Sequence, residues 1–264
     1  MAVRVAIIMP LNRDGTDMGP PVRRRLGRGH RSKAIWAILG VLLLFWACNA
    51  APDVGRQPSG QDTDGGDVVQ LPDPVLSSQV SIEEALSSRR SVRDYGREPL
   101  SLARASQLAW AAQGVTNKRG FRTAPSAGAL YPLELYVVAG AVEGLAAGAY
   151  RYLPEDHSLV RVTGGDLRKQ VAEAALNQSF VARGAVVFVF TAVYERTTQK
   201  YGERGIRYVH MEAGHAAQNL LLEATALGLA AVPVGAFHDN ELANVVGLPE
   251  GEHPLYVIPV GTQA

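Results

Sequence analysis

Cysteine is nearly absent from this sequence of 264 residues, which contains a single one, Cys48. One cysteine excludes an internal disulfide framework and a metal site built on cysteine. The sequence also lacks the HExxH motif of zinc proteases, the nucleophile elbow of serine hydrolases and the phosphate-binding P-loop. We therefore expect no metal site, and the chemistry must come from other residues.

A large excess of charge is absent as well, because 26 lysines and arginines accompany 25 aspartates and glutamates. The basic residues gather near the N-terminus, which leaves the rest of the chain acidic on balance. A nucleic-acid-binding protein normally carries a basic patch or stripe on its folded domain. The charge distribution therefore indicates no nucleic-acid partner.

A continuous apolar run extends from Ala34 to Ala47 and follows Arg31 and Lys33. The run is short for a membrane-spanning helix, which needs about 20 residues, and suits the apolar region of a signal peptide. Ala47 and Cys48 together are similar to the lipobox of bacterial lipoproteins, in which the cysteine carries the lipid. Residues 1–48 are therefore predicted to be a lipoprotein leader lipidated at Cys48, an uncleaved membrane anchor or an ordinary cleaved signal.

A lipidated or anchored leader would hold the protein on the exported side of the bacterial cytoplasmic membrane. Met18 is an alternative start site to Met1. If the leader is an artefact of the choice of start site, the protein would be cytoplasmic. Residues 49–79 are rich in proline, glycine and aspartate and show no apolar period, which is typical of a flexible linker. Residues 80–264 are expected to form the folded domain.

Helical and strand patterns interleave along residues 80–264 without an internal repeat. This order predicts an α+β fold built on a sheet. The expected helices are 82–88, 102–113, 166–176, 208–227 and 239–246, and the expected strands are 133–139, 149–153, 158–162, 185–193, 229–234 and 255–260.

The helix predicted from residue 208 is apolar on nearly every side, with small or apolar residues recurring at steps of three and four. Such a helix belongs in a core or between subunits. Gly228 is expected to end it, and a short strand then leads to the turn at Gly235 and Ala236. Bare backbone amides at such a turn can contact a planar cofactor, although a plain core helix and strand would also explain the pattern.

Two further segments have residues suited to holding a nucleotide. Arg89, Arg90 and Ser91 could bind a phosphate through paired guanidinium donors and a hydroxyl, although an isolated run of this kind is more often a solvated surface. The loop from Pro125 to Gly128 offers small residues, a hydroxyl and backbone amides along a ring edge, although alone it is simply a turn. Together with the turn at residue 235, the three segments suggest one flavin nucleotide.

The sequence resembles the nitroreductase superfamily of FMN enzymes, and within it the SagB-type dehydrogenases, which are related to the oxidases that aromatise azoline rings in modified peptides. The residues that carry this resemblance are Ser88 to Tyr95 (SRRSVRDY), Pro125 to Glu134 (PSAGALYPLE), Lys200, Tyr201, Arg204, Arg207, Gly214, Gln218, Asn219 and Gly228 to Phe237 (GLAAVPVGAF).

The resemblance implies a nitroreductase-like α+β fold, with a central mixed, mainly antiparallel sheet flanked by helices, in an intertwined homodimer with a flavin in each interface. It implies that Arg89, Arg90 and Ser91 hold the FMN phosphate and ribityl chain, and that Arg93 lies near the N1/O2 edge of the ring. The remaining cofactor-binding residues that it implies are Pro125, Ser126, Ala127, Gly128, Asn219, Pro233, Val234, Gly235 and Ala236, with the last two near N5.

In the peptide-modifying relatives, an adjacent lysine and tyrosine serve azoline oxidation, so the resemblance implies a catalytic role for Lys200 and Tyr201. Removal of a proton as hydride leaves for N5 is the role that such a pair would have. A lysine and a tyrosine in a polar stretch are also common in a solvated loop. The residues alone leave both interpretations open.

We expect an FMN-dependent oxidoreductase that passes two electrons through flavin N5 in a ping-pong cycle. Its substrate would be a small molecule or a peptide, with NAD(P)H or a quinone as the redox partner. The first alternative is an azoline dehydrogenase of thiazoline- or oxazoline-containing peptides that uses Lys200 and Tyr201. The second, of another class, is a non-catalytic, membrane-tethered lipoprotein that binds flavin or another ligand.

Overall fold

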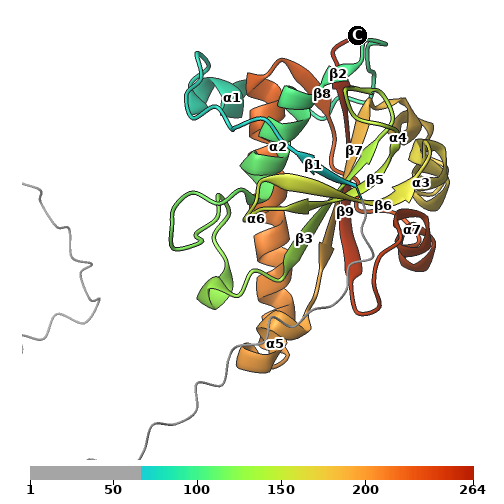
Figure 1. Ribbon diagram of the computed structural model, residues 1–264. Coiled ribbons are helices and arrows are strands. Elements are labelled where there is room, and N and C mark those ends of the chain that lie inside the picture. The colour runs from blue at the N-terminus through green and yellow to red at the C-terminus, as the bar shows by residue number, and fades with distance from the viewer. Residues whose placement is uncertain (1–66) are drawn as a thin grey trace, which may run out of the picture. The chain divides into compact units, whose positions relative to one another are not determined.

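The computed structural model describes residues 67–264 (Figure 1). The predicted leader 1–48, its candidate lipidation site Cys48 and most of the predicted linker lie outside the described residues. Within residues 67–264, no helix combines the length and the apolar character needed to cross a bilayer.

The helices and strands interleave along the chain, as the sequence predicts. The helices are α1 (Ile82–Ser88), α2 (Leu102–Gln113), the 3-10 turn η1 (Ala127–Ala129), α3 (Arg168–Ala174), α4 (Ser179–Arg183), α5 (Glu195–Tyr201), α6 (Arg204–Ala226) and α7 (Asp239–Val246). The strands are β1 (Val68–Gln70), β2 (Leu100–Ser101), β3 (Leu133–Ala139), β4 (Val142–Glu143), β5 (Gly148–Leu153), β6 (Ser158–Gly164), β7 (Val186–Ala192), β8 (Leu229–Ala231) and β9 (His253–Thr262).

Seven strands form one sheet in the order β1-β6-β5-β3-β7-β9-β8. Every neighbouring pair in this sheet is antiparallel, and a separate parallel pairing joins β2 to β4. Helices cover both faces of the sheet (Figure 1). The predicted α+β, nitroreductase-like fold with a mainly antiparallel sheet is confirmed.

The two central strands are buried along their whole length, because each of their faces is covered by helices. Successive side chains point to opposite faces of a strand. Leu135 and Val137 accordingly join the core beneath α2 and α6, whereas Tyr136 and Val138 join a second core with α3 and α7. The uninterrupted apolar sequence of β3 and β7 is therefore explained by two cores rather than one.

Side-chain caps fix the starts of α1 and α2. The Ser81 side chain accepts a hydrogen bond from the backbone N–H of Glu84, and Ser101 does the same for Arg104. Such caps satisfy backbone donors that have no partner within the helix. Both helices have the bounds that the sequence predicts.

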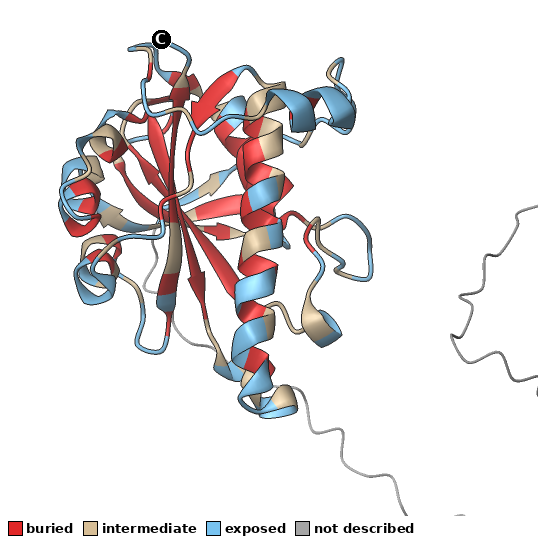
Figure 2. Ribbon diagram, turned by 180° about the vertical axis from the view of Figure 1, so that it is seen from behind, coloured by how far each residue is buried: buried red, intermediate tan, exposed pale blue. Residues whose placement is uncertain are grey.

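The helix α6 differs from its prediction in two respects. It begins at Arg204 rather than at residue 208, because Gly202, with a φ of 58°, separates it from α5. It is also buried along one side only, and exposed and half-exposed residues follow its outward side (Figure 2). The outward side includes Ile206 and Met211, which are 43% and 53% exposed.

Three shorter segments also correct the predictions. Lys200 and Tyr201, for which a solvated loop was one interpretation, lie at the end of the helix α5. Val68–Gln70 form β1 against β6, so ordered structure begins inside the segment 49–79 predicted as linker. The strand β8 ends at Ala231, because the chain leaves β9 and rejoins it only at Val234.

Candidate functional site

The arginine-rich segment after α1 lies beside the segment that follows β8. The backbone N–H of Val92 donates a hydrogen bond of 3.0 Å to the carbonyl of Ala231. This backbone contact joins residues 89–93 to the last residue of β8, two positions before residues 233–236, although the two segments are far apart in the sequence. The structure therefore brings together two of the three segments predicted to hold the flavin, and we call them the arginine half.

The cations of the arginine half lie at the surface. Ser91 and Arg93 are exposed, and the guanidinium of Arg90 donates to the carbonyls of Ser87 and Arg89 at 2.9 and 2.8 Å. Among the described residues, the ion pairs do not include Arg89, Arg90 or Arg93. Their charge is therefore available to an anion such as a phosphate.

The loop from Pro233 to Ala236 is fixed by its backbone. Val234 and Val257 exchange two backbone hydrogen bonds of 2.8 and 2.9 Å. The Gln178 side chain donates to the carbonyl of Ala236 at 3.1 Å. Between these contacts Gly235 is exposed, and the nearest atom to a Cβ placed there would be Cε1 of Tyr256 at 3.8 Å. The backbone at residue 235 is thus held in place and open to a flat group.

Arg93 lies against α4, and its implied place near a ring edge stays a prediction. Its guanidinium lies 5.6 Å from the centre of the Phe180 ring on α4, and its carbonyl accepts a hydrogen bond from Arg183. This cation–π contact is of the exposed, weak kind. The Arg93 side chain can therefore turn to another partner at small cost.

The third predicted segment, Pro125 to Gly128, meets Lys200 and Tyr201 at the N-terminal end of α6. A Cβ at Gly128 would lie 2.8 Å from Oη of Tyr201 and 3.0 Å from Nζ of Lys200. Gly128 also has a φ of 65°, which favours glycine. The absence of a side chain at this position is what allows the close approach, and we call this group of residues the lysine–tyrosine half.

The helix α5 carries Lys200 and Tyr201 and is attached to the same loop. The Arg196 guanidinium donates to the carbonyl of Tyr131 at 3.1 Å and pairs with Glu134 at 2.6 Å. The ring of Tyr201 packs edge-on against Tyr208 of α6, with 5.2 Å between centroids. Lys200 is exposed and Tyr201 is partly buried, so both can reach a ligand at the surface.

Glu212 is a buried acid at this half that the sequence reasoning missed. It lies on the inner side of α6 and is 3% exposed. Burial raises the pKa of its carboxyl to about 7, and a hydrogen bond from Ser126 together with the charge of Arg122 partly opposes that rise. The signal was present, because Glu212 is an acid on the same helical face as Val209 and Ala216.

Arg122 is the second residue that was missed. Its guanidinium lies 4.6 Å from the centre of the Tyr131 ring and donates to Oε1 of Gln113 at 2.9 Å. Burial lowers the pKa of Arg122, and Glu134, among other nearby acids, opposes that change. No sequence motif marks this arginine, because its partners come from distant segments.

Asn219 belongs to neither half. Its amide donates to the carbonyl of Thr123 at 3.3 Å. It lines a pocket of about 330 Å³ between α1, α2 and α6, whose walls include Trp110 and Leu222. Its predicted contact with the cofactor stays a prediction.

The two halves lie at different ends of α6 in one chain. Lys200 and Tyr201 lie where α6 begins, whereas β8, which contacts the arginine half, follows the end of α6 (Figure 1). A helix of 23 residues is about 35 Å long at a rise of 1.5 Å per residue. Within a single chain, residues 89–91 and the lysine–tyrosine half therefore lie far apart.

The order of these segments on this fold agrees with a known family of proteins. Residues 86–262 match the model of the nitroreductase family. The chain belongs to this family. Its members are generally flavin-dependent oxidoreductases. The match covers every described element from the end of α1 to β9, and with it both halves of the candidate site.

Individual relatives cover most of the chain. A protein of Methanocaldococcus jannaschii, provisionally named a nitroreductase, is 50% identical over 193 residues, which are 73% of this chain and 95% of the relative. A crystal structure of a provisionally named nitroreductase from Ralstonia eutropha superposes with a TM-score of 0.67 at 31% identity, covering 76% of this chain and 91% of that one.

A third similar structure comes from a peptide-modifying assembly. It is a chain of the microcin synthetase complex McbBCD of Escherichia coli, with truncated pro-MccB17 bound. The TM-score is 0.59 and the identity 26%, and the alignment covers 74% of this chain and 77% of that one.

Proposed function

We propose that the protein is an FMN-dependent oxidoreductase that transfers two electrons in a ping-pong cycle. The observation that carries the proposal is the meeting of Lys200 and Tyr201 with Gly128. It places two proton-carrying side chains against the loop that, by family resemblance, lines the flavin ring. The family membership of the chain supports a flavin as the bound group.

The residues of the arginine half fit FMN. A phosphate needs donors and positive charge, and Arg89, Arg90 and Ser91 offer both at the surface. A ring system needs backbone that it can approach closely, and the open position at Gly235 provides it. When bound, FMN supplies a carrier that accepts a hydride at N5 and passes it to a second substrate.

The chain's own residues would bind the FMN phosphate, orient the flavin ring and accept the proton that the substrate releases. Arg89 and Ser91 anchor the phosphate end, and the amides at Gly235 and Ala236 position the ring edge that reacts. When a substrate loses two hydrogens from neighbouring atoms, one leaves a C–H bond as hydride and the other leaves a C–H or N–H bond as a proton. Nζ of Lys200 and Oη of Tyr201 are the groups placed to hold that proton.

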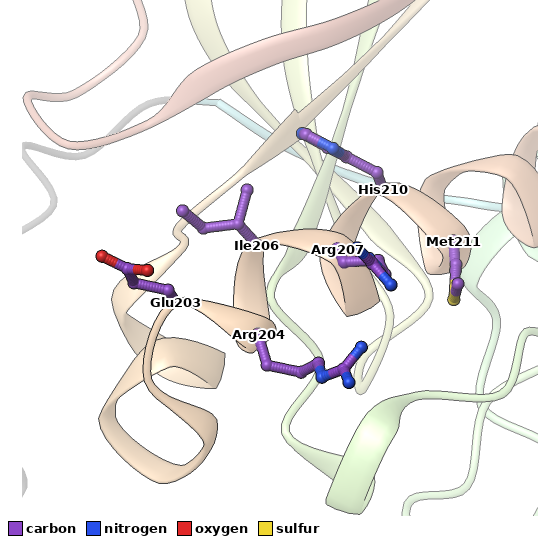
Figure 3. A pocket seen from close by; sticks show the side chains of 6 residues that line it. All are labelled: Glu203, Arg204, Ile206, Arg207, His210 and Met211. Carbon is purple, nitrogen blue, oxygen red and sulfur yellow. The ribbon is translucent and has the colours of Figure 1, made fainter.

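A second copy of the chain would complete the site. The outward side of α6 exposes Ile206 and Met211 beside Arg204 and Arg207, around an open surface pocket of about 940 Å³ (Figure 3). Exposed large apolar side chains on a long helix favour burial against a partner. A homodimer through this side of α6 would let the arginine half of one protomer meet the lysine–tyrosine half of the other.

For the substrate, the observations favour a peptide that carries an azoline ring. Conversion of an azoline to an azole would give one hydride to the flavin and one proton to Lys200 or Tyr201, and a quinone as the second substrate would then take the two electrons from the flavin. The similar chain from E. coli belongs to a synthetase complex that holds pro-MccB17, a peptide. A small molecule is the second candidate, with NAD(P)H or a quinone as the redox partner.

The location of the enzyme remains the proposal made from the sequence. A lipidated Cys48 would tether the folded domain on the exported side of the membrane through the linker. A non-catalytic, tethered lipoprotein is the rival function. The proximity of Lys200 and Tyr201 to Gly128 favours the enzyme, because a binding module has no need of two proton-carrying groups there.

The proposal is tested on the purified protein by absorption spectroscopy before and after denaturation. We expect a flavin spectrum and release of about one FMN per chain. Turnover is then compared for a synthetic azoline peptide and for quinone or nitroaromatic substrates. A colourless protein that also fails to take up added FMN would contradict the oxidoreductase and support the tethered binding module.

A further inference from the structure

The helix α5 is too short to fix its own position. It has seven residues, and no side chain of the described residues caps its start at Tyr194. Gly202, with a φ of 58°, separates it from α6. A helix of this length is marginal in water, so contacts with the rest of the fold must hold it in place. Those contacts therefore decide where the last residues of α5, Lys200 and Tyr201, lie.

Arg196 joins α5 to the loop before β3 and to β3 itself. Its Nη1 donates to the carbonyl of Tyr131 at 3.1 Å and lies 2.6 Å from Oε1 of Glu134. The planar guanidinium has its donors in a fixed arrangement, so one side chain can hold two acceptors at once. A single residue of α5 is thereby fixed to both ends of the segment 131–134.

Glu134 is itself held by Arg151 of β5. Nη2 of Arg151 lies 3.0 Å from Oε1 of Glu134, and its Nε donates to Oε2 at 3.2 Å. The Glu134 side chain is only 10% exposed, which leaves little water around its carboxylate. Loss of either arginine would leave a buried charge without one of its partners, and such a loss is costly. The contact of Arg196 with Glu134 therefore anchors α5 to the central sheet as well as to the loop.

The spacing along α5 extends this anchor to Lys200. Residues four apart lie on the same face of a helix, so Arg196 and Lys200 share one face. Arg196 contacts the loop at Tyr131, and Nζ of Lys200 lies 3.0 Å from where a Cβ at Gly128 would be. The N–H of Tyr131 donates to Oγ of Ser126 at 2.9 Å, which joins the two ends of this loop. One face of α5 thus meets the loop at two points.

The loop is strained at the residue that Arg196 contacts. Ala129 and Tyr131 have φ values of 52° and 46°, in the left-handed region that favours glycine, and neither is a glycine. Residues with side chains persist in this region only when their surroundings hold them there. The hydrogen bond from Arg196 to the carbonyl of Tyr131 is one of the contacts that does so.

We propose that Arg196 is a positioning residue of the lysine–tyrosine half, which holds α5 against the loop so that Lys200 reaches Gly128. Its anchor is Glu134. Arg196 acts through Lys200 rather than on the substrate. The consequence for turnover rests on the proposed function, in which Lys200 holds a proton. The consequence for the position of α5 does not, because it follows from the contacts of Arg196 alone.

The test compares four variants of the full-length protein. Arg196→Ala removes both contacts, and Arg196→Lys keeps the charge on a shorter side chain that reaches one acceptor at most. Glu134→Gln keeps the shape of the anchor without its charge. Arg168→Ala is the matched control, because Arg168 of α3 also pairs with an acid, Asp166, and donates to a backbone carbonyl, that of Gly184.

The first measurement is hydrogen exchange at the end of α5. The amide of Gly202 donates to the carbonyl of Thr198 at 2.7 Å, so its exchange rate reports how firmly the last turn of α5 is held. We expect Arg196→Ala to speed exchange at Gly202 about 10-fold, since the net contribution of a hydrogen bond is lost. Arg196→Lys and Glu134→Gln should speed it less, and Arg168→Ala should leave it unchanged. An unchanged rate in Arg196→Ala would overturn the proposal.

Steady-state kinetics with an azoline peptide then distinguish positioning from general support of the fold. We expect Arg196→Ala to lower kcat per bound FMN about 10–100-fold at an unchanged KM, because a displaced Lys200 no longer meets the substrate proton. Arg196→Lys should recover part of the rate. A residue that only supports the fold would lower the yield of flavin-bound protein and leave kcat per bound FMN as in wild type, which would overturn the proposal. If Arg196→Ala does not fold, the same comparison of Arg196→Lys with wild type decides.

FMN uptake, measured separately on the same proteins, keeps the two proposals apart. Faster exchange at Gly202 in Arg196→Ala, in a protein that takes up no FMN, would support the placing of α5 by Arg196 and contradict the oxidoreductase. FMN uptake with exchange at Gly202 unaltered by Arg196→Ala would support the oxidoreductase and overturn the positioning role.

Discussion

The two halves of the candidate site are built by different means. In the arginine half, backbone hydrogen bonds from Val92 and Val234 place the segments, and the charged side chains project outward. In the lysine–tyrosine half, side chains do the placing, because Ser126 accepts a hydrogen bond from the Tyr131 N–H and Arg196 donates one to the Tyr131 carbonyl. One half is a fixed frame for a ligand, and the other is a side-chain network that a single substitution can loosen.

Because the halves are built differently, we expect substitutions in one half to change the affinity for FMN and substitutions in the other to change the turnover rate. Substitutions in the arginine half should change how tightly FMN binds, because its exposed side chains contribute charge rather than support for the fold. Substitutions in the lysine–tyrosine half should change the rate, because they move the groups that handle the proton. The predictions below test that separation, beginning with the largest expected effect.

Removal of the proton-handling groups should have the largest effect. We expect Lys200→Ala and Tyr201→Phe each to lower kcat for azoline oxidation by about 10²–10⁴-fold, the usual contribution of a positioned acid or base. Bound FMN per chain should stay as in wild type. Steady-state kinetics and flavin content measure both, and a variant that loses FMN but keeps its rate per bound flavin would contradict the separation.

Removal of a phosphate-binding cation should act on affinity. We expect Arg89→Ala to weaken FMN binding by about 10–100-fold, since a hydrogen bond to a charged group contributes about 1.5–3 kcal/mol. At saturating FMN the rate should recover. Arg119→Ala is the control, because Arg119 is an exposed arginine that contacts Phe121 outside both halves. Equal weakening in both variants, measured by fluorescence titration, would argue against a specific phosphate site.

Filling the space at Gly128 should disturb both stability and rate. A Cβ there meets Oη of Tyr201 and Nζ of Lys200, and the φ of 65° is unfavourable for alanine. We expect Gly128→Ala to destabilise the fold by about 1 kcal/mol and to lower turnover as well.

Gly144→Ala is the matched control for this clash. Its φ is 76°, and a Cβ there would meet nothing within 4 Å. Gly144→Ala should therefore lower the stability of the fold, because alanine disfavours a positive φ, but it should leave turnover unchanged. Thermal unfolding and steady-state rates of the two variants together isolate the contact with Lys200 and Tyr201, and equal rates would count against its importance.

The pH dependence of stability should show the smallest effect. The folded pKa of Glu212, about 7, exceeds its ordinary value of 4.5, so the stability that it contributes is complete below 4.5 and is lost as pH rises through 7. Glu212→Gln removes this loss. We expect its Tm to gain about 2–4 °C on wild type between about pH 5 and about pH 8. A Tm difference that is constant across this range would exclude a titrating Glu212.

The sequence predicted much of the fold because the signals were local. The helices α1 and α2 and the apolar strands β3 and β7 each have a sequence pattern of their own, and the structure confirms the positions predicted for them. The strand β1 was missed, because its three residues are stabilised by pairing with β6 rather than by any pattern of their own.

The residues of the candidate site likewise fall into those that the sequence predicts and those that it does not. The segments that carry a recognisable motif were predicted, and in the structure they lie in two groups. Glu212 and Arg122 carry no motif, because the burial of Glu212 in α6 and the contact of Arg122 with the Tyr131 ring arise only in the folded chain. The apolar period of α6 predicted a helix that is apolar on nearly every side, whereas one side of α6 is exposed in a single chain (Figure 2).

The central claim, that two protomers complete one site, can be tested by combining two inactive variants. Arg89→Glu would disable the arginine half and Tyr201→Phe the lysine–tyrosine half, each carried on a chain with a different affinity tag. Heterodimers purified through both tags should regain about half of the wild-type activity, because one of their two sites is then built from two intact halves. If the halves act within one chain, every site in the heterodimer carries a lesion, and activity would stay at the level of the parent variants.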